Sequence, residues 1–233
     1  MEADASLEAL VNRLRSILSI SPDERAVVFS SWQDALAIAS HALTANGIPH
    51  VRSKSGGAKG LQGAVREFLD GVERDEARRA SLGEQTGERA GGATTPRSRL
   101  GADATALSPA PLAREPAPRV LLLLTSQGSN GLNLTAARHV IFLEPLLDPG
   151  VEAQATGRID RFGQTRETFV HRLVIRGSVE ENLRRLAHAR AEARARGRGA
   201  LAEATAALPG ADERQHLTPR DVAQMLALPA RDE

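Results

Sequence analysis

Three short apolar runs, each followed by a stretch with helical spacing, constrain the fold of this chain most strongly. The runs are AVVFS at 26–30, RVLLLL at 119–124 and HVIFLE at 139–144. Strands that are apolar on both faces are typical of parallel sheets covered by helices on both sides. The sequence therefore predicts an α/β fold, with a mostly parallel sheet and helices on both of its faces.

The surrounding sequence divides the chain into three regions. Residues 1–20 place apolar side chains at helical spacing, which predicts an N-terminal amphipathic helix. Residues 21–195 alternate strand and helix patterns and form the predicted lobe. Residues 196–233 are rich in Gly, Ala and Arg at first, so we expect a flexible tail that ends in the short helix LTPRDVAQMLAL.

One segment of the lobe departs from this pattern. Residues 71–118 are rich in Gly, Pro, Ser, Thr, Ala and mixed charge, contain no Phe or Trp, and show no sustained period. Such a segment cannot bury enough apolar surface to offset the entropy of ordering itself. Because strand-like sequence resumes at Arg119, we expect a disordered insertion inside one domain.

Composition limits the classes of function. The chain of 233 residues has 41% hydrophobic and 25% charged residues, which indicates a globular protein. Its net charge is only +1, so no overall positive potential attracts nucleic acid. No apolar run approaches the length of a membrane span, and the acidic N-terminus lacks a secretory pattern, so an intracellular protein without a membrane partner is expected. Cys is absent, which excludes a RING-type zinc site, and the scattered histidines predict no metal site.

Nearly all the basic residues are Arg, with Lys only at Lys54 and Lys59. A GC-rich genome that favours Arg codons explains this bias, and so does phosphate recognition by forked guanidinium groups. Composition alone leaves both explanations open.

Three segments carry candidate chemistry, and each also has a purely structural explanation. In VVFSSWQ, at 27–33, Ser30 and Ser31 follow a buried strand and precede a helix. They either bind a phosphate together with the N–H groups of the helix start, or simply end the strand and cap the helix.

The second segment is TSQGSNGLNLT, at 125–135. Small polar residues and two glycines at the carboxyl end of a strand let the backbone approach a ligand, and open α/β sheets bind ligands there. The alternative is an ordinary tight turn.

The third segment is QATGRIDRFGQ, at 154–164, in which Arg158 and Arg161 share one helix face or a turn that continues it. Neighbouring guanidinium groups repel each other, so a polyanion such as a nucleotide γ-phosphate gives a reason for the pair. Neutralisation by Asp160 and Glu152 is the structural alternative. The chain has no G-x-x-x-x-G-K-[S/T] phosphate loop. The nearest candidate, SGGAKG at 55–60, has its residues in the wrong order.

Taken in order, these segments resemble motifs IV, V and VI of the Swi/Snf-type helicase-like ATPases. The stretch GSNGLNLTAARHVIFLEPLLDPGVEAQATGRIDRFGQT carries the resemblance, which covers residues 25–70 and 119–190. EPLLDP and the terminal LTPRDVAQMLAL are most similar to the branch of RING-finger ubiquitin ligases with a linker-histone-like domain and a PHD finger. The resemblance implies the second of two RecA-like lobes.

The resemblance also implies roles for individual residues. Arg158 and Arg161 correspond to the arginine fingers that act on ATP, and one departure from the family is Asp160, where His or Tyr is common. The positions implied at the nucleotide interface are Gln154, Gly157 and Gly131. Those implied to hold the DNA backbone are Ser30, Ser31, Thr125, Ser126 and Gly128.

In the family, ATP and Mg²⁺ are bound mainly by the first lobe, so we expect none to be bound by this chain alone and no ATP turnover without that lobe. The implied partners are the DNA backbone, which is bound without sequence preference, and an N-terminal RecA-like lobe in cis or in trans. Chromatin or ubiquitin-ligase components are further implied partners, and the implied localisation is the nucleus. The chain is expected to be a C-terminal piece of a larger translocase. A stand-alone module that binds DNA or a partner, and a scaffold fragment of a ubiquitin ligase, are the alternatives.

Overall fold

The computed structural model describes residues 2–21, 23–53, 58–87, 116–129, 131–197 and 219–226. Its centre is a five-stranded sheet with the strand order β2-β3-β1-β4-β5. All of the pairings between these strands are parallel. The strands are β1 (Ala26–Ser30), β2 (His50–Arg52), β3 (Val120–Leu124), β4 (His139–Phe142) and β5 (Phe169–Arg172).

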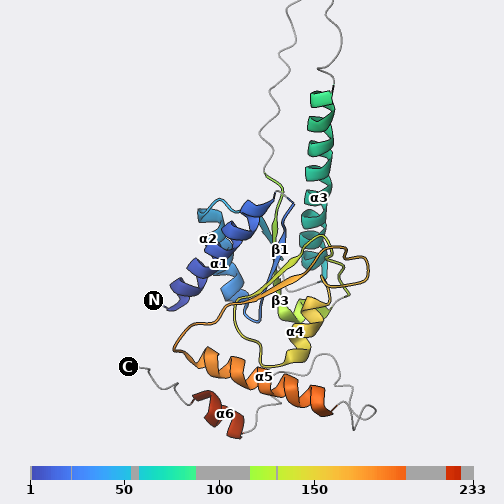
Figure 1. Ribbon diagram of the computed structural model, residues 1–233. Coiled ribbons are helices and arrows are strands. Elements are labelled where there is room, and N and C mark those ends of the chain that lie inside the picture. The colour runs from blue at the N-terminus through green and yellow to red at the C-terminus, as the bar shows by residue number, and fades with distance from the viewer. Residues whose placement is uncertain are drawn as a thin grey trace, which may run out of the picture.

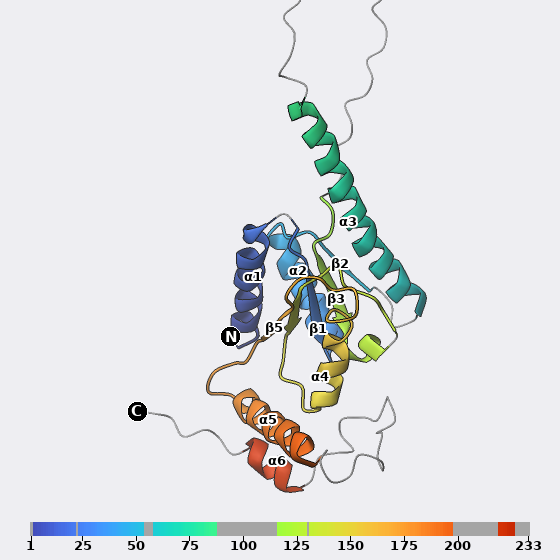
Figure 2. The same ribbon diagram turned by 45° about the vertical axis from the view of Figure 1, so that its right-hand side comes forward.

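Helices cover both faces of the sheet, as the apolar runs predicted (Figure 2). On one face α1 (Glu2–Ile20) and α2 (Gln33–Ala45) pack against side chains such as Val28 and Ile141. On the other face α3 (Ala58–Gly87) and α4 (Pro149–Thr156) pack against Phe29 and its neighbours. Successive residues of β1 thus serve opposite layers, which is why that strand is apolar throughout.

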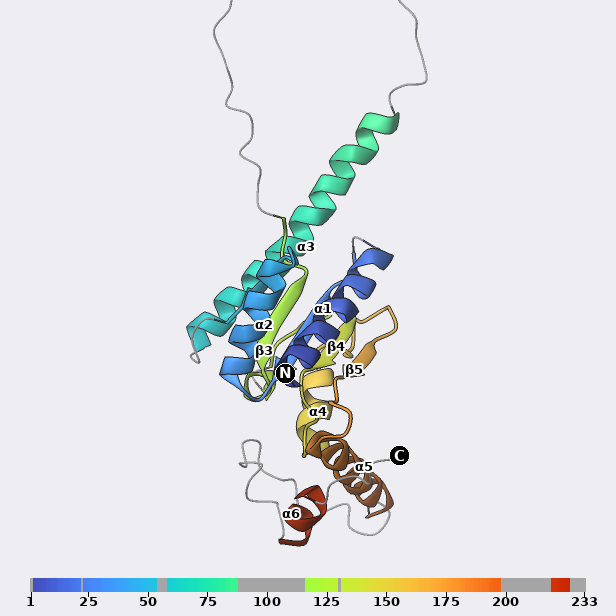
Figure 3. The same ribbon diagram turned by 90° about the vertical axis from the view of Figure 1, so that its left-hand side faces the viewer.

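Two further helices lie beyond α4. α5 (Val179–Gly197) and α6 (Pro219–Leu226) pack side by side at the bottom of Figures 1 and 3. The side-chain amide of Asn182 joins them by donating to the Met225 carbonyl at 3.2 Å. The short terminal helix was predicted. The predicted flexibility of residues 196–233 concerns mostly residues outside the described ranges.

The prediction that disorder begins at residue 71 is wrong for residues 71–87. These residues continue α3, which extends well past the sheet (Figure 1). Their sequence, GVERDEARRASLGEQTG, is rich in good helix formers, so helix propensity supports a segment that has no apolar period. Of the rest of the predicted insertion, residues 88–115 lie outside the described residues, and residues 116–118 lead into β3 without regular secondary structure.

A buried arginine fastens the base of this extension. Arg25 is 2% exposed and donates from Nη1 to the Pro118 carbonyl at 2.6 Å. Its Nη2 donates to the Gly71 carbonyl at 3.1 Å and to the Asp75 carboxylate at 2.5 Å. One side chain therefore binds α3 and the chain just before β3 to the start of β1.

Within the described residues, no helix combines the length and the apolar character that crossing a membrane requires.

Candidate nucleic-acid and nucleotide interface

The carboxyl ends of β1, β3 and β4 meet at one edge of the sheet because these strands are adjacent and parallel. Ser31, Thr125 and Glu144 follow these strands and form what we call the strand-end cluster. The Ser31 hydroxyl lies 3.3 Å from the Thr125 hydroxyl. The Ser31 amide N–H donates to Oε1 of Glu144 at 2.5 Å. The first two candidate segments are thus joined directly, at the edge where open α/β sheets bind ligands.

Ser30 has a different position from Ser31. Its side chain is fully buried, and its hydroxyl accepts from the Trp32 amide at 3.0 Å and lies 3.3 Å from the Trp32 carbonyl. The geometry therefore favours Ser30 as a support for the turn, and leaves direct contact with a ligand to the exposed Ser31. Helix α2 begins after Trp32, with no side-chain cap, so Ser31 does not cap it.

Glu144 is the charged member of the strand-end cluster. Burial raises the pKa of its carboxyl, and the hydrogen bonds from the Ser31 amide and from the hydroxyls of Ser30 and Ser31 partly offset that effect. The nearby carboxylate of Glu180 acts in the same direction as burial. Among the described residues, Glu144 forms no ion pair with an arginine or lysine. Its charge is therefore held by hydrogen bonds alone.

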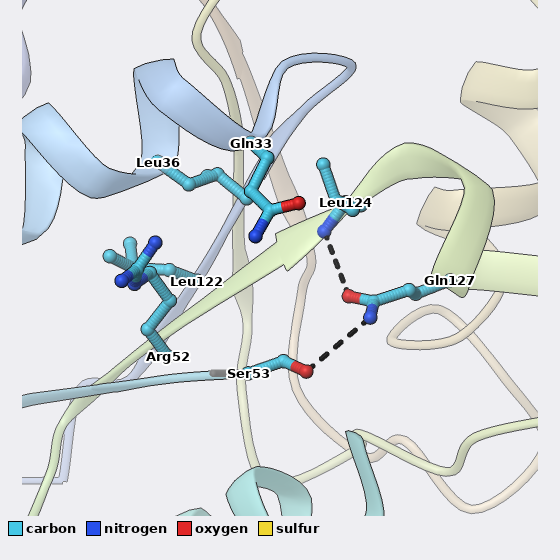
Figure 4. Close-up of a pocket in the computed structure, with 7 residues that line it drawn as sticks. All are labelled: Gln33, Leu36, Arg52, Ser53, Leu122, Leu124 and Gln127. Atoms are coloured by element: carbon cyan, nitrogen blue, oxygen red, sulfur yellow. Dashed lines mark hydrogen bonds between the residues drawn. The ribbon is translucent and has the colours of Figure 1, made fainter. Parts of the chain in front are cut away.

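After β3 the chain forms the short 3₁₀ helix η1 (Thr125–Ser129), which contains Thr125, Ser126 and Gly128 of the predicted DNA contacts. The buried Gln127 anchors it, accepting from the Leu124 amide at 3.1 Å and donating to the Ser53 hydroxyl at 3.4 Å (Figure 4). The pocket beside Gln127 has a volume of about 10 Å³, enough for one water molecule. It is too small for a nucleotide.

Arg158 and Arg161 lie in the turn that continues α4, one of the two placements that their spacing allowed. The helix starts as predicted at Asp148 and Pro149, with the Asp148 carboxylate accepting from the Gly150 amide at 2.7 Å. Between the two arginines Ile159 is fully buried, which anchors the turn in the core, whereas Arg161 is exposed.

The turn that carries the arginines is bonded to the 131–137 segment. The Leu134 amide donates to the Arg158 carbonyl at 2.9 Å. The side-chain amide of Gln164 donates to the carbonyls of Thr135 and Ala137 at 3.0 and 2.9 Å. In addition, η1 packs against α4. The second and third candidate segments therefore form one connected unit.

The proposed neutralising partners of the arginines are engaged elsewhere or unpaired. Glu152 binds Arg172 of β5, with Nε of the arginine 2.9 Å from the carboxylate. Asp160 forms no ion pair among the residues that the structure describes. Neither of these two carboxylates therefore forms an ion pair with Arg158 or Arg161.

The remaining predicted positions lie on the same connected unit. Gln154 is exposed on α4, and Gly157 ends that helix. A side chain at Gly157 would place its Cβ 3.2 Å from the Ala153 carbonyl, so the close packing there favours glycine. Gly131 has a φ of +66°, a conformation that favours glycine. Whether these residues contact a nucleotide stays a prediction.

Sequence reasoning did not identify Glu144, Gln127 or Gln164 as site residues. The position of Glu144 directly after a buried strand was a usable signal, because the ends of neighbouring parallel strands converge. Gln127 and Gln164 bind main-chain groups of other segments, which no local pattern reveals.

Among the described residues, no group of three or more His, Cys, Asp or Glu side chains is arranged so that it could hold a metal ion. His139 instead lies 3.0 Å from the Glu24 carboxylate through Nε2 and 3.1 Å from His171 through Nδ1. Burial lowers the pKa of His139, and it lowers the pKa of His171 to about 4, with smaller effects in the same direction from Arg13 and His139. These histidines form a structural network.

Comparisons with known proteins agree with this geometry. The family model described as the helicase conserved C-terminal domain matches residues 113–163. The human E3 ubiquitin-protein ligase SHPRH is 31% identical over 177 residues, which are 76% of this chain and 8% of the relative. The DNA repair protein rad5 of Aspergillus fumigatus is 30% identical over 191 residues, which cover 78% of this chain and 13% of the relative.

Among solved structures, the crystal structure of the C-terminal part of the Fun30 ATPase domain superimposes with a TM-score of 0.55 and 21% identity, covering 78% of this chain and 44% of that one. The parallel sheet with its two helical layers therefore defines the class as a RecA-like α/β lobe. More particularly, the chain carries the C-terminal lobe of a Swi/Snf-type helicase-like ATPase, near the RING-finger ubiquitin-ligase branch. It spans 8% of the length of SHPRH and 13% of the length of rad5.

Proposed function

We propose that this chain acts as the second lobe of an ATP-dependent translocase on double-stranded DNA, in chromatin remodelling or DNA repair in the nucleus. The observation that carries the proposal is the direct contact between Ser31 and Thr125 at the carboxyl edge of the sheet, on a unit continuous with the arginine turn. The names of relatives, which include a DNA repair protein and chromatin-remodelling ATPases, support the same assignment.

In this proposal the strand-end cluster contacts the DNA backbone. The hydroxyls of Ser31 and Thr125, with Ser126 and the backbone around Gly128, present neutral hydrogen-bond donors. Such groups suit phosphate oxygens and do not distinguish bases. We expect binding to duplex DNA to be independent of sequence and to weaken as salt rises, because phosphate contacts release counterions.

The DNA-binding part is tested by titrating labelled duplex DNA with the chain at several salt concentrations. A variant with Ser31→Ala and Thr125→Ala should bind at least about a hundredfold more weakly, because two hydrogen bonds to a charged group are lost, at about 1.5–3 kcal/mol each. Ser19→Ala is the matched control, because that hydroxyl is bonded to its own helix at the Ser16 carbonyl. Equal affinity of the double variant and the control would refute a DNA site at the strand-end cluster.

The residues present fit one half of an ATP site. Arg158 and Arg161 lie on an anchored turn, whereas the sequence lacks the phosphate loop that would hold the β- and γ-phosphates. Bound ATP supplies a γ-phosphoryl group whose charge grows during transfer, and guanidinium groups stabilise such charge. We propose that Gln154, Gly157 and Gly131 shape the surface that meets the first lobe, which would supply the other half of the site and Mg²⁺.

The nucleotide part is tested by ATP hydrolysis in the presence of DNA. We expect no turnover by the chain alone, and turnover when a Swi/Snf-type first lobe is added. Arg158→Ala or Arg161→Ala should then lower the rate about a thousandfold, as loss of an arginine finger does. Arg184→Ala, an exposed arginine on α5, is the control. Hydrolysis by the pure chain, or full activity of both finger variants, would contradict the proposal.

A further inference from the structure

The carboxylate of Glu144 occupies the backbone N–H that directly follows β1. Its Oε1 accepts from the Ser31 amide at 2.5 Å, beside the Ser31 and Thr125 hydroxyls. A backbone N–H at the end of a parallel strand is a strong donor to an anion. In the structure that donor is already used by an anionic group of the chain itself.

The surroundings of Glu144 hold it in place without neutralising its charge. The hydrogen bonds to it come from an amide and from hydroxyls, and the like charge of Glu180 raises its pKa further. Glu180 itself accepts from the Ile175 amide at 2.8 Å, so it is fixed at the start of α5. A carboxylate in such a place gains hydrogen bonds but no ion pair, and an incoming phosphate can replace those bonds with equivalent ones.

We propose that Glu144 is an internal competitor for the DNA-backbone site: it occupies the Ser31 amide in the absence of DNA and must leave it when a DNA phosphate binds. The inference rests on the proposed DNA contact at the strand-end cluster and adds a residue that sets its affinity. Glu144 thus keeps the DNA affinity of the isolated lobe low, and removing its charge strengthens binding.

Two substitutions separate competition from a positioning role. Glu144→Gln keeps the acceptor oxygen and the size of the side chain but removes the charge. Glu144→Ala removes both the acceptor and the charge. Competition predicts tighter binding for both variants. A carboxylate that merely positions Ser31 predicts unchanged binding for Glu144→Gln and weaker binding for Glu144→Ala.

The experiment measures the affinity of the full chain for labelled duplex DNA at fixed pH and low salt, after thermal melting has shown that each variant folds. We expect Glu144→Gln to bind about tenfold more tightly, the effect of removing one like charge near a phosphate close to the protein surface. Asp34→Asn is the matched control: it removes one exposed negative charge in the first turn of α2, and its affinity should stay within about twofold of the native chain.

The outcomes distinguish the inference from the proposed function. If Ser31→Ala with Thr125→Ala weakens binding while Glu144→Gln leaves it unchanged or weaker, DNA binds at the cluster but Glu144 is no competitor. If Asp34→Asn tightens binding as much as Glu144→Gln, the effect is one of net charge and the inference is overturned. If the Ser31 and Thr125 variant binds normally, the proposed DNA site itself fails.

Discussion

The buried guanidinium of Arg25 should contribute more to stability than any other polar side chain described here. It is 2% exposed and binds two main-chain carbonyls, of Gly71 and Pro118, and the carboxylate of Asp75. Its carbon atom Cζ also lies 5.7 Å from the centre of the Phe68 ring. Burial lowers the pKa of Arg25 and the Asp75 charge raises it, so the ion pair offsets part of the desolvation.

Arg25→Met is the informative substitution because Met is a long side chain that fills space but has no donor. The change leaves two carbonyls without their donor, at about 1–3 kcal/mol each, when water cannot replace it. Asp75 also loses its hydrogen bond from Arg25, but its side chain is 28% exposed and can be hydrated. Breaking a buried ion pair on one side costs about 3–5 kcal/mol. We therefore expect a loss of about 4 kcal/mol in the free energy of unfolding.

Urea unfolding measures this loss, with Arg15→Met as the matched control. Arg15 is exposed, and within the described part of the chain it donates only to the Asn46 side chain, at 2.7 Å, so its replacement should cost less than about 1 kcal/mol. Hydrogen exchange should also rise in the 71–87 part of α3, which Arg25 fastens to the sheet. A loss below about 1 kcal/mol for Arg25→Met, or unchanged exchange in α3, would refute the reasoning.

Three further predictions concern single side chains. Burial lowers the pKa of His171 to about 4 in the folded state. Between about pH 6.5, the ordinary pKa of histidine, and about pH 4, the unfolded chain therefore binds more protons than the folded chain, and the free energy of unfolding should fall as pH drops. His171→Gln should flatten that part of the pH profile of urea unfolding. Gly63 lies in a helix with open space around it, so Gly63→Ala should stabilise the protein by about 1 kcal/mol. Gly47 has a φ of +65°, so Gly47→Ala should destabilise the protein by a similar amount. Equal effects of the two substitutions would refute the claim that backbone conformation decides the sign. Gln164→Leu should cost about 1–3 kcal/mol, because two carbonyls of the 135–137 segment lose a donor, and a neutral result would mean that water replaces the amide.

The architecture could be predicted because the apolar sequence of the strands indicates that both of their faces are buried. β1 and β3 are apolar on both faces, and only a parallel sheet between two helical layers buries such strands completely. The start of the insertion could not be predicted in the same way. The 71–87 segment has no apolar stripe, and one of its anchors, the Arg25–Asp75 pair, joins residues 50 positions apart. Local composition contains no trace of such a contact.

In the candidate site too, features defined by local sequence could be predicted, whereas a contact between distant segments could not. The spacing of Arg158 and Arg161 and the hydroxyls at the strand ends were visible in the sequence, because residue type and order define them. The partner of the Ser31 amide was not visible, since Glu144 lies 113 positions away and reaches it only through the sheet. The sequence suggested that the Ser31 hydroxyl caps α2; in the structure that hydroxyl lies beside the Thr125 hydroxyl, and the helix has no side-chain cap.

The connection between the strand-end cluster and the arginine turn bears on how the proposed translocase would work. Thr125 starts η1, η1 packs on α4, and the Arg158 carbonyl holds the Leu134 amide. Every link is a short main-chain contact or a contact between packed elements, so a rearrangement within the lobe would break several hydrogen bonds at once. DNA contact and nucleotide contact are therefore expected to move together, as one rigid body against the first lobe. In that arrangement, the displacement of Glu144 from Ser31 proposed above would be a local change that leaves these links intact.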